Sequence, residues 1–336
     1  MSTVVFDADV LGRQRTGDET YALNLLRELG KLASEAGIRL VAVTRHTELV
    51  PPGVEPIALP ARVQELRMAV RLPLLLRRLR PALVHFVHAL PPWLPCPAVL
   101  TVQDLSFERD ASLMGARETA IFRFVVPRSA RRAARIFAIS ERTKCDLVEL
   151  YSLPPERIVV TPLAADPAFR PGGTRGDYLL LAGAIEPRKD PLVAAAAAKA
   201  VGRRLVVVGP ERDPALAAAL RAEGAELRGF VPKEELVRLT QEAAALLFPT
   251  RHEGFGLPVA EAMAAGTPVV ATPDPAVREV GGDAVAYATP AEFAATLARV
   301  LADPEPWRRA GLDRSRTLSW ERTAAETVRV YRELVA

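Results

Sequence analysis

Residues 251–270 constrain the fold of this chain most, because their pattern predicts a loop, a short helix and a strand one directly after another. The apolar run 244–248 just before them is typical of a buried strand. Gly254 and Gly256 let the backbone approach a ligand closely, and Gly266 stops the helix before the next strand. The pattern predicts a glycine-rich turn between the carboxyl end of a strand and the start of a helix.

Such a turn is a ready site for an anion, because unpaired N–H groups and the helix dipole point toward it. Two carboxylates frame the turn, Glu253 in the loop and Glu261 on the helix. A glutamate early in a helix ordinarily complements the helix dipole and does no more. The surrounding motif favours a binding role for both residues.

The motif Glu253-Gly-Phe-Gly-Leu-Pro, followed by Glu261-Ala-Met-Ala-Ala-Gly-Thr-Pro-Val, resembles the signature of the retaining glycosyltransferases of family 4, which have the GT-B fold. The resemblance implies that Glu253 lies near the hydroxyls of the donor sugar and that Glu261 holds the ribose of the nucleotide. It also implies that backbone amides face the donor diphosphate at Gly254, Phe255, Gly256 and Leu257.

A second motif, Gly183…Pro187-Arg188-Lys189-Asp190, resembles the family pattern G-x-x-x-P-R-K-N, whose basic pair grips the donor diphosphate. Two adjacent cations beyond a strand suit a dianion and can neutralise a leaving group, although an isolated Arg-Lys pair is usually solvated. The resemblance further places the backbone around Phe230 and Val231 beside the nucleobase.

The opening strand, residues 3–9, runs into a polar loop that ends at Gly17, and Asp18 is a candidate N-cap for the following helix. The resemblance implies that Gly17, or in second place Gly12, faces the donor phosphates; a plain turn glycine is the alternative. Asp7-Ala-Asp9 matches a metal-binding DxD pattern of another glycosyltransferase fold. Its place on the opening strand speaks against that role, and family 4 enzymes are generally metal-independent, so we expect no metal and no cofactor.

Family relatives usually read His-Asp where this chain has Gln103-Asp104, in a segment that the resemblance places near the reacting sugar. Glutamine can donate and accept hydrogen bonds, but it does not titrate. Both Gln103 and Asp104 are candidate catalytic residues. His85 or His88, at the end of the neighbouring strand, is a candidate substitute for the missing histidine; each also fits a loop or packing role.

A chain of 336 residues exceeds what one core usually covers, so two domains are expected. Strands and helices alternate in both halves, which predicts mainly parallel sheets with helices on both faces. The expected fold is therefore α/β, GT-B, with two facing Rossmann-like domains and a ligand cleft between them. We expect an acceptor domain at 1–165, a donor domain at 166–318 and a helix at 319–336 that packs back toward the first domain.

Two cysteines give no disulfide framework, and no signal peptide opens the chain, so we expect a cytoplasmic protein. No uncharged apolar run is long enough to span a membrane. The net charge of +4 comes from the first half, where residues 1–165 carry about five excess positive charges, concentrated in 62–80 and 117–144. These arginines are either solvated helix faces or a peripheral contact with anionic lipid at the inner membrane face. No nucleic-acid-binding module accompanies them.

The resemblance implies a retaining hexosyltransferase that moves a mannose-, rhamnose- or glucose-like sugar from a nucleotide sugar to an acceptor hydroxyl. The donor would be GDP-mannose or a UDP- or dTDP-sugar, and the acceptor a carbohydrate or a lipid-linked glycan. Bacterial enzymes of surface polysaccharide or glycolipid synthesis are the nearest in pattern. The alternatives are a GT-B protein that binds nucleotide sugar without transferring it, and a phosphorylase or hydrolase on the same fold.

Overall fold

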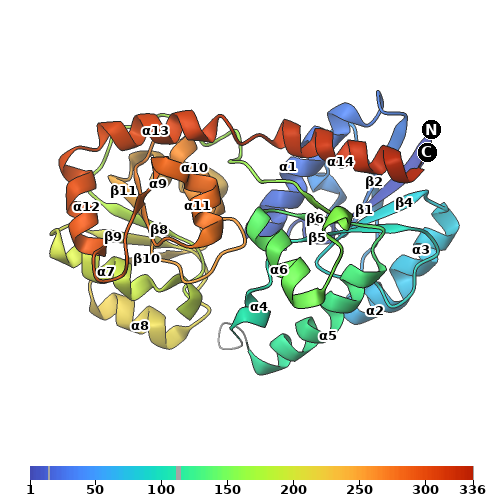
Figure 1. The fold of residues 1–336 in the computed structure, drawn as a ribbon, viewed down its shortest axis with the longest axis horizontal. Helices are drawn as coiled ribbons and strands as arrows, with labels where there is room; N and C mark the ends of the chain where they lie inside the picture. The colour runs from blue at the N-terminus through green and yellow to red at the C-terminus, as the bar shows by residue number, and fades with distance from the viewer. Residues whose placement is uncertain (14–15, 111–114, 336) are drawn as a thin grey trace. The chain divides into compact units, whose positions relative to one another are not determined.

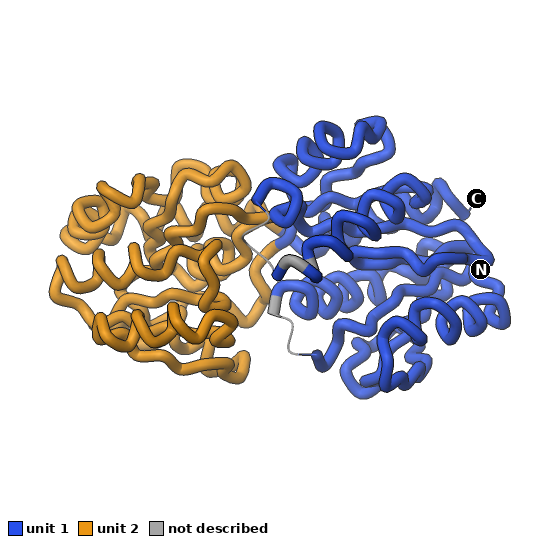
Figure 2. The backbone as a smooth tube through the Cα atoms, turned by 90° about the horizontal axis from the view of Figure 1, so that it is seen from below, with its two compact units in different colours: residues 1–163, 319–336 blue, residues 164–318 orange. Residues whose placement is uncertain are grey.

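The computed structural model describes residues 1–13, 16–110 and 115–335, which divide into two compact units (Figure 2). Unit 1 comprises Met1–Leu163 and Ser319–Ala336, and unit 2 comprises Ala164–Leu318. Each unit has a parallel sheet with helices on its faces, as the alternating pattern of strands and helices predicts. The predicted α/β class with two Rossmann-like domains is confirmed.

Within the described residues, unit 1 has a seven-stranded sheet in the order β3-β2-β1-β4-β5-β6-β7. Its strands are β1 (Ser2–Asp7), β2 (Ile38–Thr44), β3 (Glu55–Ala58), β4 (Leu83–Val87), β5 (Ala98–Val102), β6 (Arg135–Ala138) and β7 (Ile158–Val160). Its helices are α1 (Thr16–Leu32), α2 (Gln64–Leu66), α3 (Leu72–Leu79), α4 (Ser106–Arg109), α5 (Ala116–Arg132), α6 (Glu141–Tyr151) and α14 (Trp320–Val335).

Unit 2, every residue of which is described, has a six-stranded sheet in the order β10-β9-β8-β11-β12-β13. Its strands are β8 (Leu179–Ala182), β9 (Leu205–Val208), β10 (Glu226–Gly229), β11 (Ala245–Phe248), β12 (Val269–Ala271) and β13 (Ala286–Tyr287). Its helices are α7 (Pro191–Ala200), α8 (Pro214–Ala222), α9 (Lys233–Glu242), α10 (Leu257–Ala264), α11 (Pro275–Gly281), α12 (Phe293–Ala302) and α13 (Glu305–Ser315).

Two helix starts differ in how they are capped. Ser140 caps α6, because its hydroxyl accepts a hydrogen bond from the backbone N–H of Thr143 at 3.0 Å. Asp18 does not cap α1, which already begins at Thr16. The carboxylate of Asp18 instead pairs with His88 at 3.1 Å, so a tertiary contact takes the side chain that local sequence assigns to the cap.

The helical segment between residues 64 and 79 is interrupted before Pro73. A π-helical turn, Arg67–Arg71, separates α2 from α3. Proline has no N–H to donate to the carbonyl four residues earlier, so the Ala69 carbonyl needs another donor. The indole N–H of Trp93 supplies it at 3.0 Å, and this bond ties the interrupted helix to the loop after β4.

Helix α14 belongs to unit 1 and packs against α1 (Figure 1). Its Tyr331 reaches the sheet, where the hydroxyl lies 2.5 Å from Nδ1 of buried His85. The other ring nitrogen of His85 lies 2.6 Å from Oγ1 of Thr101, which also contacts the hydroxyl of Tyr21. One buried polar chain thus joins α14, β4, β5 and α1.

Candidate functional site

The sheet of unit 2 reverses its strand order between β8 and β11. The strands that follow β8 in the chain, β9 and β10, lie on one side of it, whereas β11, β12 and β13 lie on the other. Ligands of open parallel sheets bind outside the carboxyl ends of the strands at such a switch point. The segments that follow β8 and β11 carry the two motifs singled out in the sequence.

These segments meet in an ion-pair cluster of Arg188, Lys189 and Glu253. Oε1 of Glu253 accepts a hydrogen bond from Nη1 of Arg188 at 3.0 Å and another from Nζ of Lys189. The hydroxyl of Thr250 donates to the same oxygen at 3.0 Å. Arg188 also donates to Glu186 at 2.8 Å. The predicted diphosphate-binding pair and the first glutamate of the signature therefore form one constellation.

Burial by itself would raise the pKa of the Glu253 carboxyl, but Lys189 and Arg188 outweigh it and lower the value to about 2. Burial lowers the pKa of Lys189, and the attraction of Glu253 opposes that shift. The carboxylate is thus ionised at neutral pH. In the absence of ligand it balances the cationic charge that an arriving anion would meet.

Two glycines shape the backbone around this cluster. Gly183 has a φ of +146°, and a Cβ there would lie 3.4 Å from Cε of Lys189, so the lysine stem packs along the bare backbone. Gly256 has a φ of +98° and directly precedes α10. Side chains rarely adopt that conformation, and glycine at this position lets the loop turn sharply into the helix. The turn presents the first N–H groups of α10 at the carboxyl end of β11.

The other glutamate of the signature, Glu261, has different neighbours. Burial raises the pKa of its carboxyl to about 8, the nearby Asp166 adds to the rise, and Lys233 opposes it. Asp166 itself forms an ion pair with Lys233. Thus the ion-pair cluster includes Glu253, whereas Glu261 lies buried one turn into α10 beside a second ion pair.

The remaining donor-site candidates of unit 2 lie on loops. Gly254 and Phe255 are buried in the turn before α10, and Leu257, its first residue, is half-buried. Phe230 and Val231 follow β10; the ring of Phe230 is exposed whereas Val231 is buried. An exposed aromatic ring beyond a strand's carboxyl end is available to stack on a planar ligand group.

In unit 1, the two glycines of the first loop differ in their surroundings; residues 14–15 of this loop lie outside the described residues. Gly12 has a φ of +73°, and a Cβ there would lie 2.6 Å from the ring of His46. Its N–H donates to Glu19 at 2.7 Å, so this amide is already bonded within the fold. Gly17 lies at the start of α1, where a Cβ would be 4.0 Å from Oε1 of Gln103.

The two aspartates of the DxD pattern face arginines. Nη1 of Arg67 lies 3.2 Å from Asp7, and Asp9 accepts a hydrogen bond from Nε of Arg45 at 2.8 Å and another from Arg13 at 3.1 Å. Arginine is permanently cationic, so each carboxylate already has a counter-charge within the protein. The pairing gives both aspartates a role in linking β1 to neighbouring segments.

The four residues considered around the missing histidine have distinct places. Gln103 is buried, and Asp104 accepts hydrogen bonds from the N–H of Ser106 at 3.0 Å and from its hydroxyl at 2.8 Å, which fixes the turn into α4. His85 is buried with both ring nitrogens engaged, and burial lowers its pKa to about 3. His88 lies beyond β4 with its side chain partly exposed.

Sequence reasoning missed four contributors to the site in unit 2. Thr250 bonds to Glu253 and Glu186 bonds to Arg188, and the ion pair of Asp166 and Lys233 lies near buried Glu261. Glu186 directly precedes the Pro-Arg-Lys motif, so its position next to two cations was a usable signal. Lys233 lies far from α10 in the sequence, and only the fold brings it there.

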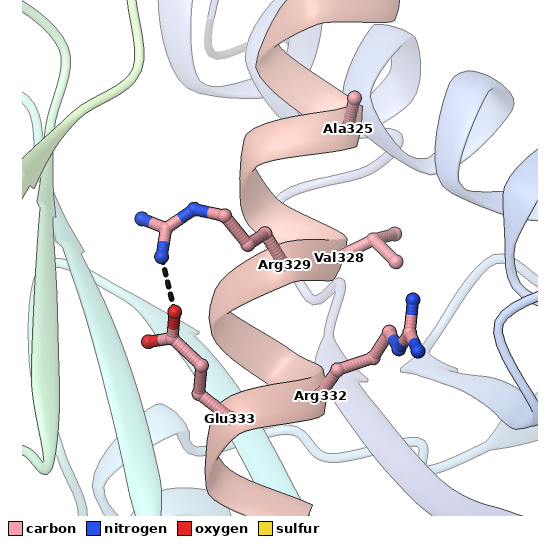
Figure 3. Close-up of a pocket in the computed structure, with 5 residues that line it drawn as sticks. All are labelled: Ala325, Val328, Arg329, Arg332 and Glu333. Carbon is pink, nitrogen blue, oxygen red and sulfur yellow. Dashed lines mark hydrogen bonds and ion pairs between the residues drawn. The ribbon is translucent and has the colours of Figure 1, made fainter.

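A hollow lined by Ala325, Val328, Arg329, Arg332 and Glu333 lies along α14, where Arg329 pairs with Glu333 (Figure 3). All five lining residues come from this one helix. None of the residues singled out by the motifs lines this hollow, so it is separate from the candidate site.

Two family profiles match the chain. One, described as Glycosyltransferase Family 4, matches residues 15–169, and the other, described as Glycosyl transferases group 1, matches residues 176–303. The chain belongs to the family-4-like glycosyltransferases. The two matched ranges fall mainly on the two units, and they include every strand of the two sheets except β1.

Several known glycosyltransferases are similar in sequence to this chain. It is 32% identical to the MMP alpha-(1->4)-mannosyltransferase of Mycolicibacterium hassiacum over 232 aligned residues. The aligned region covers 62% of this chain and 56% of that protein. It is 28% identical to the O-antigen chain mannosyltransferase B of Escherichia coli, with 60% and 61% covered. The D-inositol 3-phosphate glycosyltransferase of Frankia alni is 33% identical, with 61% and 60% covered. The chain thus spans about three fifths of the length of these relatives.

Solved structures support the GT-B fold of this family-4-like glycosyltransferase. The sucrose-phosphate synthase of Thermosynechococcus elongatus matches with a TM-score of 0.78 at 17% identity, covering 99% of each chain. WaaG, a glycosyltransferase involved in lipopolysaccharide biosynthesis, matches with a TM-score of 0.72 at 18% identity, covering 98% of this chain and 99% of that one. At such identities the likeness concerns the fold alone.

Proposed function

We propose that this protein transfers a sugar from a nucleotide sugar to an acceptor hydroxyl, with retention of the anomeric configuration, in the synthesis of a glycan. One observation carries the proposal: Arg188, Lys189 and Glu253 gather at the switch point of unit 2. The cluster lies where parallel sheets bind nucleotides, and it combines cations for a diphosphate with a carboxylate for sugar hydroxyls.

The donor diphosphate lies between the cations and the start of α10. Arg188 and Lys189 exchange their contact with Glu253 for contacts with phosphate oxygens, and the N–H groups of the turn at Gly254–Leu257 add further donors. Charge grows on the diphosphate as its bond to the sugar breaks. Donors that are already oriented toward it stabilise that charge without reorganisation.

Glu253, released from the two cations, accepts hydrogen bonds from hydroxyls of the donor sugar and so orients its anomeric carbon. Glu261 binds the ribose hydroxyls. Phe230 and Val231 flank the nucleobase. These assignments follow the family pattern residue by residue, and they fit the ionised state of Glu253.

The reaction needs neither a metal nor another cofactor in this proposal. The bond between the anomeric carbon and the phosphate oxygen breaks, and the acceptor oxygen bonds to that carbon on the same face. The acceptor proton passes to the departing phosphate oxygen. The cationic pair and the helix start meet the diphosphate charge that a metal ion would otherwise neutralise. The donor is GDP-mannose or a UDP- or dTDP-sugar.

The acceptor is a carbohydrate or a lipid-linked glycan, and unit 1 presents it. The protein lies in the cytoplasm, at the inner membrane face. The α2–α3 face, defined here as Val63, Leu66, Val70 and Leu74, is exposed by 51%, 52%, 42% and 45%. Exposed arginines flank it at positions 62, 71, 77 and 78.

An apolar helix face with cationic borders suits the surface of an anionic bilayer, because apolar side chains enter the acyl boundary while arginines meet lipid phosphates. None of the helices in residues 1–13, 16–110 and 115–335 combines the length and the apolar composition needed to cross a bilayer. The proposed contact is therefore peripheral, and nucleic acid is not a proposed partner.

Incubation with a panel of nucleotide sugars and glycan or lipid-linked acceptors tests the function. Nucleotide release that depends on acceptor, with a product of retained anomeric configuration, supports transfer. Tight donor binding without turnover would instead support a binding protein. Release that needs only water or phosphate would support a hydrolase or a phosphorylase.

A further inference from the structure

The side chain of His252, in the turn after β11 and directly before Glu253, has unused hydrogen-bonding capacity. The residue is 8% exposed. Its backbone carbonyl accepts hydrogen bonds from Nη1 of Arg188 at 2.8 Å and from the hydroxyl of Thr250 at 3.2 Å, which fix its place in the turn. Neither ring nitrogen forms a hydrogen bond or an ion pair with any residue that the structure describes. Buried polar groups ordinarily have partners, so this imidazole points to a ligand.

Asp274, which follows the neighbouring strand β12, has unused capacity of the same kind. It caps α11, because its Oδ1 accepts the backbone N–H of Ala276 at 2.9 Å and that of Val277 at 3.3 Å. Its Oδ2 accepts no hydrogen bond from the described part of the chain, although the residue is only 8% exposed. A cap that uses one carboxylate oxygen leaves the other for a donor from outside the fold.

The turns that carry these two side chains are joined to each other. Strand β12 pairs with β11, and beyond the strands the hydroxyl of Thr272 donates to the carbonyl of Thr250. Burial raises the pKa of the Asp274 carboxyl, and the charges of Glu253 and His252 act on that pKa in opposite directions. Both neighbours therefore lie within electrostatic reach of Asp274, without a direct hydrogen bond to it.

Glu253 faces this group as well as the cations. The hydrogen bonds that it accepts from Arg188, Lys189 and Thr250 all reach Oε1. Its Oε2 has no partner among residues 1–13, 16–110 and 115–335. Strand β11 lies between β8 and β12 in the sheet, so the cationic pair comes from the β8 side and Asp274 comes from the β12 side.

The division between the two sides decides which part of a donor each one suits. A hydroxyl donates to a carboxylate, whereas a phosphate is repelled by it, so the β12 side favours hydroxyls and the β8 side favours the diphosphate. We propose that His252 and Asp274 bind hydroxyl groups of the transferred sugar and determine, together with Glu253, which sugar the protein accepts. The inference rests on the proposed sugar transfer and adds two residues to sugar recognition. The imidazole donates through one nitrogen and accepts through the other, and Oδ2 of Asp274 accepts.

Removal of the imidazole should affect the sugar and not the diphosphate. His252→Ala should lower kcat/KM for the nucleotide sugar that the donor panel selects by about 10- to 100-fold, because a buried hydroxyl loses its partner. The Kd of the bare nucleoside diphosphate should not change. His252→Gln keeps a donor and an acceptor and should retain part of the activity. A wild-type kcat/KM in His252→Ala would overturn the proposal, and so would weaker binding of the bare diphosphate.

Asp274→Asn separates recognition from folding. Asparagine caps helices as well as aspartate does, so its amide oxygen can keep the bonds to Ala276 and Val277 while its NH₂ group replaces Oδ2. The midpoint of thermal unfolding should therefore change little. The value of kcat/KM should fall about tenfold or more, because an acceptor for a hydroxyl has become a donor. A kcat/KM equal to that of wild type would contradict the proposal.

Asp213→Asn is the matched control in the same unit. Asp213 caps α8 by accepting the N–H of Leu216 at 3.0 Å, and like Asp274 it directly precedes a proline. The stability and kcat/KM of Asp213→Asn should equal those of wild type. An equal loss of kcat/KM in Asp213→Asn and Asp274→Asn would show that the loss does not come from a sugar contact, and the role of Asp274 would fall.

Monodeoxy analogues of the same nucleotide sugar identify the hydroxyl that is bound. With the analogue that lacks the hydroxyl bound by His252, wild type and His252→Ala should react at nearly the same rate, because neither can form the bond. If the loss in His252→Ala is the same for every analogue, the residue does not contact a hydroxyl and the proposal is wrong.

Calorimetric titration distinguishes failure of the inference from failure of the proposed function. If the wild type transfers no sugar from any donor of the panel, sugar transfer is wrong. Weaker binding of the nucleotide sugar by His252→Ala, with unchanged binding of the bare diphosphate, would still support the sugar contact. If transfer is observed and His252→Ala binds and reacts as wild type does, only the inference is lost.

Discussion

Nη1 of Arg188 lies 3.0 Å from Oε1 of Glu253, and the same oxygen accepts a hydrogen bond from Nζ of Lys189. Two cations thus share one carboxylate oxygen in a buried position. The arrangement keeps both side chains in place without ligand, and it couples the protein's stability to the residues that we assign to donor binding.

Removing one partner of this cluster should cost both stability and activity. Glu253→Gln leaves buried Lys189 without its carboxylate, which typically costs about 3–5 kcal/mol in the free energy of unfolding. Lys189→Met should cost less, because Arg188 still pairs with Glu253 at 3.0 Å. The double variant should regain part of that stability but none of the transfer activity. Urea unfolding and the transfer assay measure the two effects.

The exposed pair Arg204–Glu226, at 3.1 Å in the same unit, provides the control for this experiment. Arg204→Met should change the free energy of unfolding by less than about 1 kcal/mol and leave transfer unaltered. Full transfer activity in the double variant of the cluster would contradict the proposed role of Glu253 and Lys189.

Glu261 should make stability depend on pH in an unusual direction. Burial raises the pKa of its carboxyl to about 8, above the value of an unfolded chain, so the folded state holds a proton that the unfolded state has lost. Stability therefore falls as pH rises from about 4.5 to about 8. Glu261→Gln cannot ionise and should gain stability relative to wild type between pH 5 and pH 8.5. A difference between the two proteins that stays constant with pH would show that burial does not perturb Glu261.

Charge on the α2–α3 face should abolish lipid binding. Leu66→Asp places a carboxylate on an exposed apolar face, and co-sedimentation with vesicles that contain phosphatidylglycerol should fall by about tenfold or more. Binding by the wild type should also weaken with salt and with neutral vesicles. Leu192→Asp, at a comparably exposed site in unit 2, should bind as wild type does. Equal binding by both variants would exclude this face as the lipid contact.

Loss of one hydroxyl should loosen α14 from its sheet. Tyr331→Phe leaves a ring nitrogen of buried His85 without its partner, so we expect a loss of about 1–3 kcal/mol in the free energy of unfolding. Tyr287→Phe is a milder comparison, because that hydroxyl donates to the Val277 carbonyl at 3.2 Å in a half-buried setting. Equal losses in the two variants would mean that the His85 contact adds nothing particular to unit 1.

The sequence predicts much of this fold because buried parallel strands are short apolar runs. The apolar run 244–248 identifies β11, Ala245–Phe248, almost to the residue. Gly266 marks the end of α10, because glycine readily adopts the left-handed φ that often follows a helix, here +72°. The ion-pair cluster follows once two motifs are placed after neighbouring strands.

Other features depend on contacts that sequence spacing does not carry. Asp18 reads as a helix cap, but a histidine distant in sequence takes its carboxylate. The π-helical turn Arg67–Arg71 precedes Pro73, and Trp93 bonds to the Ala69 carbonyl within this turn. Arg67 is buried, and it pairs there with Asp7 of β1. A reading of the helix alone predicts a solvated arginine there. Helix α13 went unpredicted as well, because its polar sequence lacks an apolar period.

The assignment of α14 to unit 1 has a consequence for a chain that is still being made. A ribosome completes every residue of unit 2 before it adds Trp320–Val335, so unit 2 can fold while unit 1 still lacks the Trp320 and Tyr331 side chains that contact Tyr21 and His85. Until α14 is added, unit 1 is incomplete although most of it was synthesised first. We expect chaperones to bind nascent chains at the sheet face that α14 later covers.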